Sequence, residues 1–125
     1  MAKFCEVSIN GIKIMAELAS NPLTQSLGLM FRKGLSDGNG MLFDFKLELF
    51  PKIWMAGMRF PIDIIWADKE KKIVHIAHEV QPASLFDWQV KTSSRPARYV
   101  LEVPAGFTRK NKITVWDEIK LKLII

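Results

Sequence analysis

Hydrophobic and polar residues alternate through much of this chain, in short runs separated by turn-forming residues. Alternation with a period of two places successive side chains on opposite faces of a β-strand. Runs of this kind, or runs of β-branched and aromatic residues, cover 4–9, 12–18, 41–45, 53–55, 62–67, 73–77, 99–103, 113–116 and 119–125. Many short strands at this spacing predict a mainly β fold, a compact β sandwich or barrel-like domain with one or two short helices.

Turn signals separate these runs. Asn10-Gly11 lies between the first two strands and is the strongest short hairpin signal, because both turn positions need positive φ. Residues 81–96 contain two prolines, adjacent serines and few periodic positions, so we expect a long loop there. Leu85, Phe86 and Trp88 within that loop must either pack down or form a binding surface.

A short helix is expected after the second strand. Ser20 or Asn21 can cap it, and Pro22 suits its first turn because that position needs no amide donor. Apolar residues follow at helical spacing over 23–30, and Gly34 ends the element. A second helical turn is expected just after the strand that covers 99–103.

Asp63 is a carboxylate inside a run that is apolar on both sides. In a strand over 62–67, it shares one face with Ile65 and Ala67, while the opposite face carries Ile62, Ile64 and Trp66. Burial of an unpaired carboxylate would cost several kcal/mol. We therefore expect a partner nearby, such as Arg59.

Glu102 is placed similarly, within the strongly β-forming run 99–103. We predict a charged cluster in which arginines neutralise Asp63 and Glu102, because a guanidinium can bind a carboxylate bidentately and still stack on Trp54 or Tyr99. Such a cluster is either a buried ion pair that fixes strand register or the lining of a small-ligand pocket. The candidate ligand-binding residues are Arg32, Trp54, Arg59, Asp63, Arg98 and Glu102.

The favoured function is non-catalytic binding of a small polar ligand, for example a carbohydrate, in a charged and aromatic cleft. One alternative is a small hydrolase or lyase that uses Asp63 and Glu102 as acid and base. The chain has no Gly-x-Ser-x-Gly elbow and no P-loop ending, which disfavours serine hydrolases and NTPases. No catalytic residue is assigned.

Metal binding is not favoured either. Soft donor atoms are present, but methionine is also an ordinary gap filler in cores; these donors are Cys5, Met30, Met41, Met55 and Met58. His75 and His78 are three apart in an expected strand, so they point to opposite faces. We predict no metal and no cofactor.

The formal net charge of +5 permits binding to anionic partners. Basic residues gather in two probable turns, which we interpret as solvated; they are Lys69, Lys71 and Lys72, then Arg109, Lys110 and Lys112. Nucleic-acid binding through these turns is a second alternative and is not favoured, because no aromatic and basic RNA-binding signature accompanies them.

A chain of 125 residues has the length of one domain, so we expect a single β domain over residues 1–125. The N-terminus has no apolar signal segment, and no run of about 20 apolar residues occurs, so we expect no membrane association. One cysteine fits a reducing compartment, and we expect a cytoplasmic protein. The apolar end 121–125 could pair with another copy, so we expect a monomer or weak dimer.

Several separate blocks of the chain resemble the uncharacterised family known as domain of unknown function 192, over roughly residues 20–119. The blocks are Gly28-Leu-Met-Phe-Arg32, Gly40-Met-Leu-Phe-Asp-Phe45, Trp54-Met55, Pro61-Ile-Asp-Ile64, Ala97-Arg-Tyr-Val-Leu-Glu-Val-Pro-Ala-Gly106 and Asp117. The resemblance implies a compact, mostly β domain of sandwich or barrel type and no established activity. Many members have Lys-Asn after the Trp-Met pair, whereas this chain has Ala56-Gly57, so a role of that polar pair is not carried over.

Overall fold

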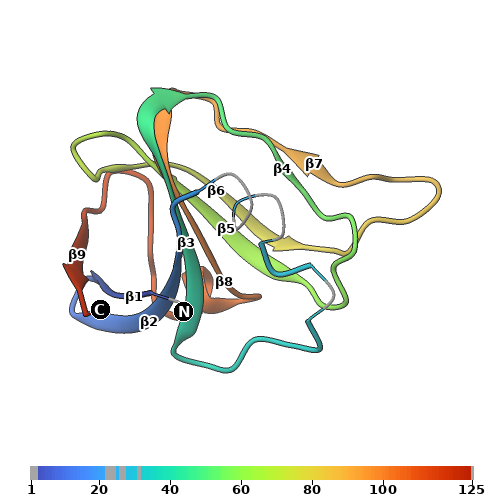
Figure 1. The fold of residues 1–125 in the computed structure, drawn as a ribbon, viewed down its shortest axis with the longest axis horizontal. Coiled ribbons are helices and arrows are strands. Elements are labelled where there is room, and N and C mark those ends of the chain that lie inside the picture. The colour runs from blue at the N-terminus through green and yellow to red at the C-terminus, as the bar shows by residue number, and fades with distance from the viewer. Residues whose placement is uncertain (1–2, 22–24, 26–27, 31, 125) are drawn as a thin grey trace.

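The computed structural model describes residues 3–21, 25, 28–30 and 32–124 and confirms a mainly β fold (Figure 1). Within these residues, one short helix, α2 (Phe107–Lys110), accompanies the strands. The strands are β1 (Phe4–Ile9), β2 (Ile12–Ala19), β3 (Asn39–Leu49), β4 (Ile53–Trp54), β5 (Ile62–Ala67), β6 (Ile73–Val80), β7 (Val90–Lys91), β8 (Ala97–Pro104) and β9 (Ile119–Leu123).

Seven strands form one sheet in the order β6-β5-β8-β3-β2-β1-β9, and β4 pairs with β7 in a separate two-stranded ribbon. The β2–β3 pair is parallel and the other neighbours are antiparallel. The two ends of the large sheet meet, because a bridge joins Lys72 to Glu118 and the Ile73 amide donates to the Asp117 carbonyl at 2.8 Å. The sheet is therefore curled like a barrel.

The first hairpin forms as the sequence predicts. Asn10 and Gly11 have φ values of 52° and 80°, which is the positive pair that a type I′ turn requires. The turn aligns Val7 with Ile14 across β1 and β2, so the apolar positions of both strands face the interior of the barrel.

Two hydrophobic cores lie on opposite faces of the sheet. Inside the barrel, Ile65 and Ala67 pack with residues of β1, β2, β8 and β9. On the outer face, Ile62, Ile64 and Trp66 pack with Leu29, Ile53 and Met55 from the segments that cover the sheet. The predicted alternation of side chains along β5 is confirmed.

Some elements differ from the prediction. The 81–96 loop contains β7, whose two residues are too short a run to predict a strand. Residues 113–116 form turns rather than a strand; Ile113 is still buried, and Trp116 has a φ of 77°. The expected helix after Asn21 falls largely on Pro22, Leu23 and Leu27, which lie outside the described residues. In the described part of the chain, no helix has the length and hydrophobicity needed to cross a membrane.

Candidate functional site

Asp63 is fully buried, as the sequence predicts, but the prediction of an arginine partner is wrong. Its oxygens accept hydrogen bonds from the Glu79 amide at 2.8 Å, the Gly106 amide at 3.1 Å, and the Thr108 amide and hydroxyl at 2.9 and 2.6 Å. Arg59 is exposed, and within the described chain it forms no ion pair. The physical reason is that amides at the start of α2 are unsatisfied donors, which a carboxylate can accept without a cation.

Thr108 extends this network to β6. Its hydroxyl donates to Asp63, so the 2.8 Å contact with His78 requires a proton on the histidine Nδ1. One buried carboxylate thus ties β5, β6 and α2 together. Its oxygens are occupied by donors, so Asp63 has a structural role here rather than that of an acid or base.

The two histidines of β6 diverge. His78 contacts Thr108, whereas the His75 ring packs edge-on against Trp66 at 5.2 Å and lies 3.3 Å from the Ser94 hydroxyl. Within the described residues, no group of three His, Cys, Asp or Glu side chains is arranged to hold a metal ion.

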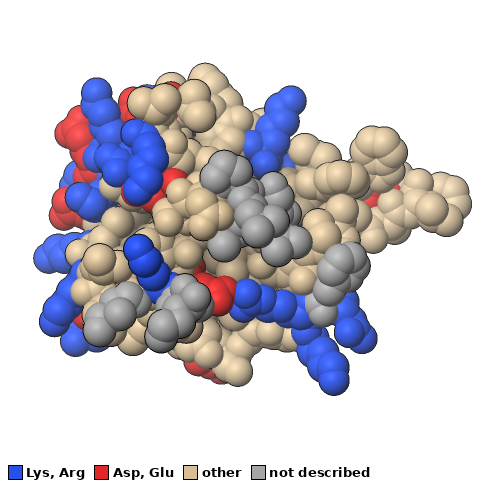
Figure 2. Space-filling model, viewed as in Figure 1, with Lys and Arg blue, Asp and Glu red and all other residues tan. Residues whose placement is uncertain are grey.

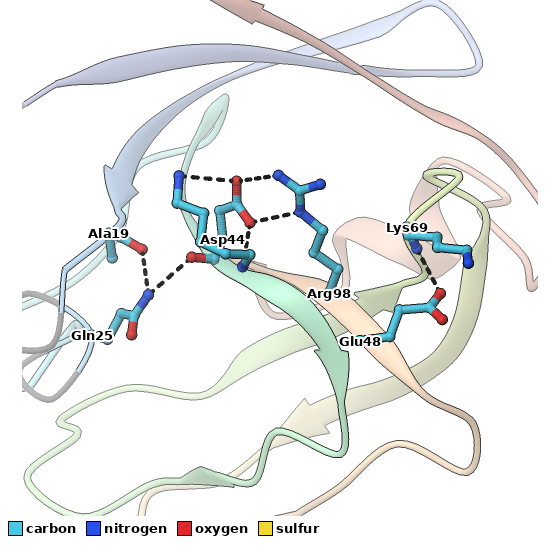
Figure 3. A network of polar contacts seen from close by, with 7 residues as sticks. Ala19, Gln25, Asp44, Glu48, Lys69 and Arg98 are labelled. Carbon is cyan, nitrogen blue, oxygen red and sulfur yellow. Dashed lines mark hydrogen bonds and ion pairs between the residues drawn. The ribbon is translucent and has the colours of Figure 1, made fainter.

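Arg98 binds a carboxylate bidentately, as expected of this side chain, but the carboxylate belongs to Asp44. Its Nε and terminal nitrogen donate to the two Asp44 oxygens at 2.9 and 3.1 Å (Figure 3), and its guanidinium lies 4.9 Å from the Tyr99 ring centre. Burial alone would raise the pKa of Asp44, but the hydrogen bonds from Arg98 and from the Lys46 amide outweigh it and lower that pKa. This pair links β3 to β8 and does not neutralise Glu102.

Arg32 is also paired elsewhere. Its guanidinium meets the Glu17 carboxylate in a partly exposed contact between the segment after residue 30 and β2. A pair of this exposure contributes little stability. The predicted cluster of two carboxylates and three arginines is therefore not formed.

The two carboxylates cannot act together. Asp63 is the cross-strand neighbour of Val103, which lies in the barrel core, whereas Glu102 is the neighbour of Ile64 and Met41, which lie in the outer core. Cross-strand neighbours share a face of the sheet, so Asp63 and Glu102 point to opposite faces. The predicted acid–base pair is not present.

A hollow of about 220 Å³ lies against the outer face of the sheet, and it contains two of the six predicted site residues, Trp54 and Glu102. That volume is large enough for several waters or one small molecule. Most of the lining is apolar; it consists of Gln25, Gly28, Leu29, Met30, Phe43, Lys52, Ile53, Trp54, Met55, Ala56, Met58 and Glu102. Sequence reasoning placed the methionines in the core and did not find this shared lining, because they come from separate segments.

Glu102 sets the electrostatics of this hollow. It is only 4% exposed, and burial raises its pKa to about 8. Among the described side chains none forms an ion pair with it, and Lys52 contributes the positive charge of the lining from an exposed position. At neutral pH the protonated form of the Glu102 carboxyl group therefore predominates, and this form can donate a hydrogen bond.

Local sequence features build the walls. The Gln25 side chain donates to the carbonyls of Ala19 and Asp44 at 3.3 and 3.0 Å, which holds its segment against β2 and β3 (Figure 3). Gly28 has a φ of 49°, and a Cβ there would lie 3.3 Å from the Phe43 ring. On the opposite side, the Met58 amide donates to the Met55 carbonyl at 3.1 Å and closes a turn.

Fold and site together define a small, mainly β, barrel-like domain with an apolar hollow that contains a carboxyl group. The chain belongs to the DUF192 family, described as an uncharacterized ACR, whose family model matches residues 5–121. A UPF0127 protein of Pyrococcus furiosus is 29% identical over 116 residues, which are 91% of this chain and 92% of that protein.

Two solved structures are similar in fold. A protein of Sinorhizobium meliloti, described as a candidate transcription regulator, has a TM-score of 0.85 and 25% identity, over 97% of this chain and 94% of its own. A protein of unknown function from Novosphingobium aromaticivorans has a TM-score of 0.82 and 26% identity, over 95% of this chain and 84% of its own.

Proposed function

We propose that this domain binds a small molecule, without catalysis, in the hollow beside Glu102. The observation that carries the proposal is Glu102 itself, a buried carboxyl group that lines a hollow and has no ion-pair partner among the described side chains. A protein gains no stability from such a group, because a neutral apolar side chain would avoid the cost of burial. Recognition of a ligand would explain why a carboxyl group is buried at this position.

The lining indicates the chemistry of the ligand. Leu29, Phe43 and the methionines favour an apolar body, while a protonated Glu102 favours a ligand oxygen that accepts a hydrogen bond. Lys52 favours a ligand of negative charge. A small aromatic or aliphatic acid satisfies all three, and a carbohydrate stacked on Trp54 is the more polar candidate.

The family blocks support the same hollow. Seven of its lining residues belong to blocks on which the resemblance rests; they are Gly28, Leu29, Met30, Phe43, Trp54, Met55 and Glu102. These blocks are far apart in the sequence and meet here. A shared binding site explains why such different segments converge on one small volume.

A thermal-shift screen tests the proposal. The probes are small carboxylic acids, aromatic acids, monosaccharides, disaccharides and nucleotides, at pH 6 and pH 9. We expect at least one probe to raise the Tm of the wild type, and both Glu102→Gln and Trp54→Ala to reduce that shift. Glu70→Gln, in an exposed turn, and Trp116→Ala are matched controls, since Trp54 and Trp116 are 56% and 54% exposed. A screen in which no probe stabilises the wild type would reject the proposal.

Nucleic-acid binding is the second candidate, and the description of the Sinorhizobium meliloti protein is the observation that favours it. The basic turn at Lys71 lies beside the start of β9, since the Ile119 amide donates to the Lys71 carbonyl at 2.8 Å. Acidic Asp117 and Glu118 share that surface and weaken its positive potential. Affinity for DNA or RNA that falls steeply with salt would support this candidate, whereas a flat response would oppose it.

A further inference from the structure

The segment between β6 and β7 makes a turn, just before the β4–β7 ribbon, that presents apolar side chains to solvent. This apolar tip, defined as Leu85 and Phe86, projects from the body of the molecule at the right of Figure 1. Leu85 and Phe86 are 91% and 97% exposed. Below them the Trp54 and Trp88 rings lie 6.0 Å apart, so aromatic surface continues from the tip to the base of the ribbon.

The tip is a built turn rather than a loose end. The Ser84 hydroxyl accepts hydrogen bonds from the Phe86 and Asp87 amides at 3.3 and 3.1 Å, and the Ser84 amide donates to the Asp87 carbonyl at 2.8 Å. The Asp87 carboxylate accepts from the Gln89 amide at 3.0 Å and from its side chain at 2.6 Å. These bonds satisfy the polar groups of the turn locally and hold Leu85 and Phe86 outward.

The charges around the tip identify its partner. Lys52 precedes β4, and Lys91 is the β7 residue that pairs with Ile53, so two cations lie at the base of the ribbon. Figure 2 shows the projecting part as mostly uncharged, with an acidic side chain visible on it and Lys and Arg side chains on the adjoining body. The acidic residue of the turn is Asp87, whose two oxygens accept hydrogen bonds from Gln89. The apolar tip comes first, the tryptophans lie below it and the cations lie at the base. This order matches the layers of an anionic membrane surface, from acyl chains through headgroups to the charged phosphates.

We propose that the apolar tip docks this domain on anionic lipid surfaces. Leu85 and Phe86 enter the boundary between headgroups and acyl chains, Trp54 and Trp88 lie at headgroup level, and Lys52 and Lys91 contact lipid phosphates. The sequence predicted no membrane association; this proposal replaces that expectation with shallow docking by a turn. Two inserted apolar side chains give weak and reversible binding, which the lysines strengthen on anionic lipid.

Vesicle sedimentation tests the proposal with the full chain. We expect sedimentation with vesicles of equal parts phosphatidylcholine and phosphatidylglycerol, and a loss of about tenfold with phosphatidylcholine alone. Leu85→Ser combined with Phe86→Ser removes the inserted groups and should reduce binding to anionic vesicles by about tenfold. Lys52→Gln combined with Lys91→Gln should reduce it severalfold and lower its dependence on salt.

Matched controls separate docking from general stickiness. Leu123→Ser removes an exposed apolar residue of β9, and Lys120→Gln removes an exposed cation there, so both should bind vesicles like the wild type. Quenching of tryptophan fluorescence by lipids brominated along the acyl chain should fall in Trp88→Phe. The proposal is overturned if the wild type does not sediment with anionic vesicles, or if the tip variant binds as well as the wild type. Self-association that the tip variant abolishes, without vesicle binding, would assign the tip to protein contact and also overturn it.

Discussion

The carboxyl groups of Asp63 and Glu102 are both buried in the same sheet, but they differ in their hydrogen-bond partners. Asp63 is satisfied by three backbone amides and a hydroxyl, so burial fixes it as a structural acceptor. For Glu102, burial is the one effect that shifts the pKa, and it raises this pKa to about 8. The sequence predicts that both are buried, because both lie in apolar runs. It cannot predict their partners, since donors to Asp63 come from residues 79 and 106–108, far along the chain.

Glu102 should make folding depend on pH. The unfolded chain releases this proton near the ordinary pKa of 4.5, whereas the folded protein retains it to about 8, so stability falls as pH rises through that window. The loss is a few kcal/mol, at about 1.4 kcal/mol for each pK unit. We expect Glu102→Gln to flatten this decline and to be the more stable protein at pH 9. Urea unfolding between pH 4 and pH 9 measures the free energy of unfolding of each variant, with Glu70→Gln as control. If this free energy depends on pH in the same way in the wild type and in Glu102→Gln, the raised pKa of Glu102 is refuted.

Asp63→Asn should destabilise the fold through its donors. An Asn amide group would place a second donor against an amide or hydroxyl that now donates to Asp63, at a cost of about 2–4 kcal/mol. Thr108→Val removes only the hydroxyl bonds and should cost about 1–2 kcal/mol. Chemical denaturation gives both values, with exposed Asp37→Asn as the control. Equal stability of Asp63→Asn and the wild type would contradict the network.

At the scale of elements, the strands that alternate most clearly were the best predicted. β5 spans the predicted residues 62–67, and the β1–β2 hairpin turns at Asn10-Gly11. β4 lies within the predicted run 53–55, but its partner β7 was missed, because a two-residue strand is stabilised by pairing across the chain rather than by its own pattern. The hollow was missed for a related reason, because its walls come from separate segments that only the tertiary fold brings together.

Close contact between β3 and β8 explains one glycine of the family blocks. A Cβ on Gly40 would lie 2.7 Å from the Glu102 carbonyl oxygen, a backbone atom that cannot move without disturbing the strand pair. Gly40→Ala should therefore destabilise the protein by about 1–3 kcal/mol. Gly34→Ala is the matched control, because nothing lies within 4 Å of a Cβ there. Thermal unfolding compares them, and equal Tm values would show that the two strands can separate at no cost.

At the scale of the molecule, closure of the sheet determines where surfaces remain open. Strand patterns predicted a sandwich or barrel but could not choose, because closure depends on the contact between Lys72 and Glu118. That contact leaves most of β9 as an edge strand with β1 on its one paired side. An edge strand exposes unpaired backbone groups that can recruit another chain.

Lys120 and Lys122 protect this edge. Both are exposed on β9, and cations repel each other when two edges approach, so we expect the wild type to be a monomer in light scattering at micromolar concentration. Replacing both with valine should promote association, because the strand would then present a continuous apolar edge beside Leu121 and Leu123. The same double change at Lys33 and Lys110, which are exposed outside β9, keeps the net charge equal and should leave the protein monomeric. A wild-type dimer that persists at high salt, or an edge variant that stays monomeric, would show that charge on β9 does not control assembly.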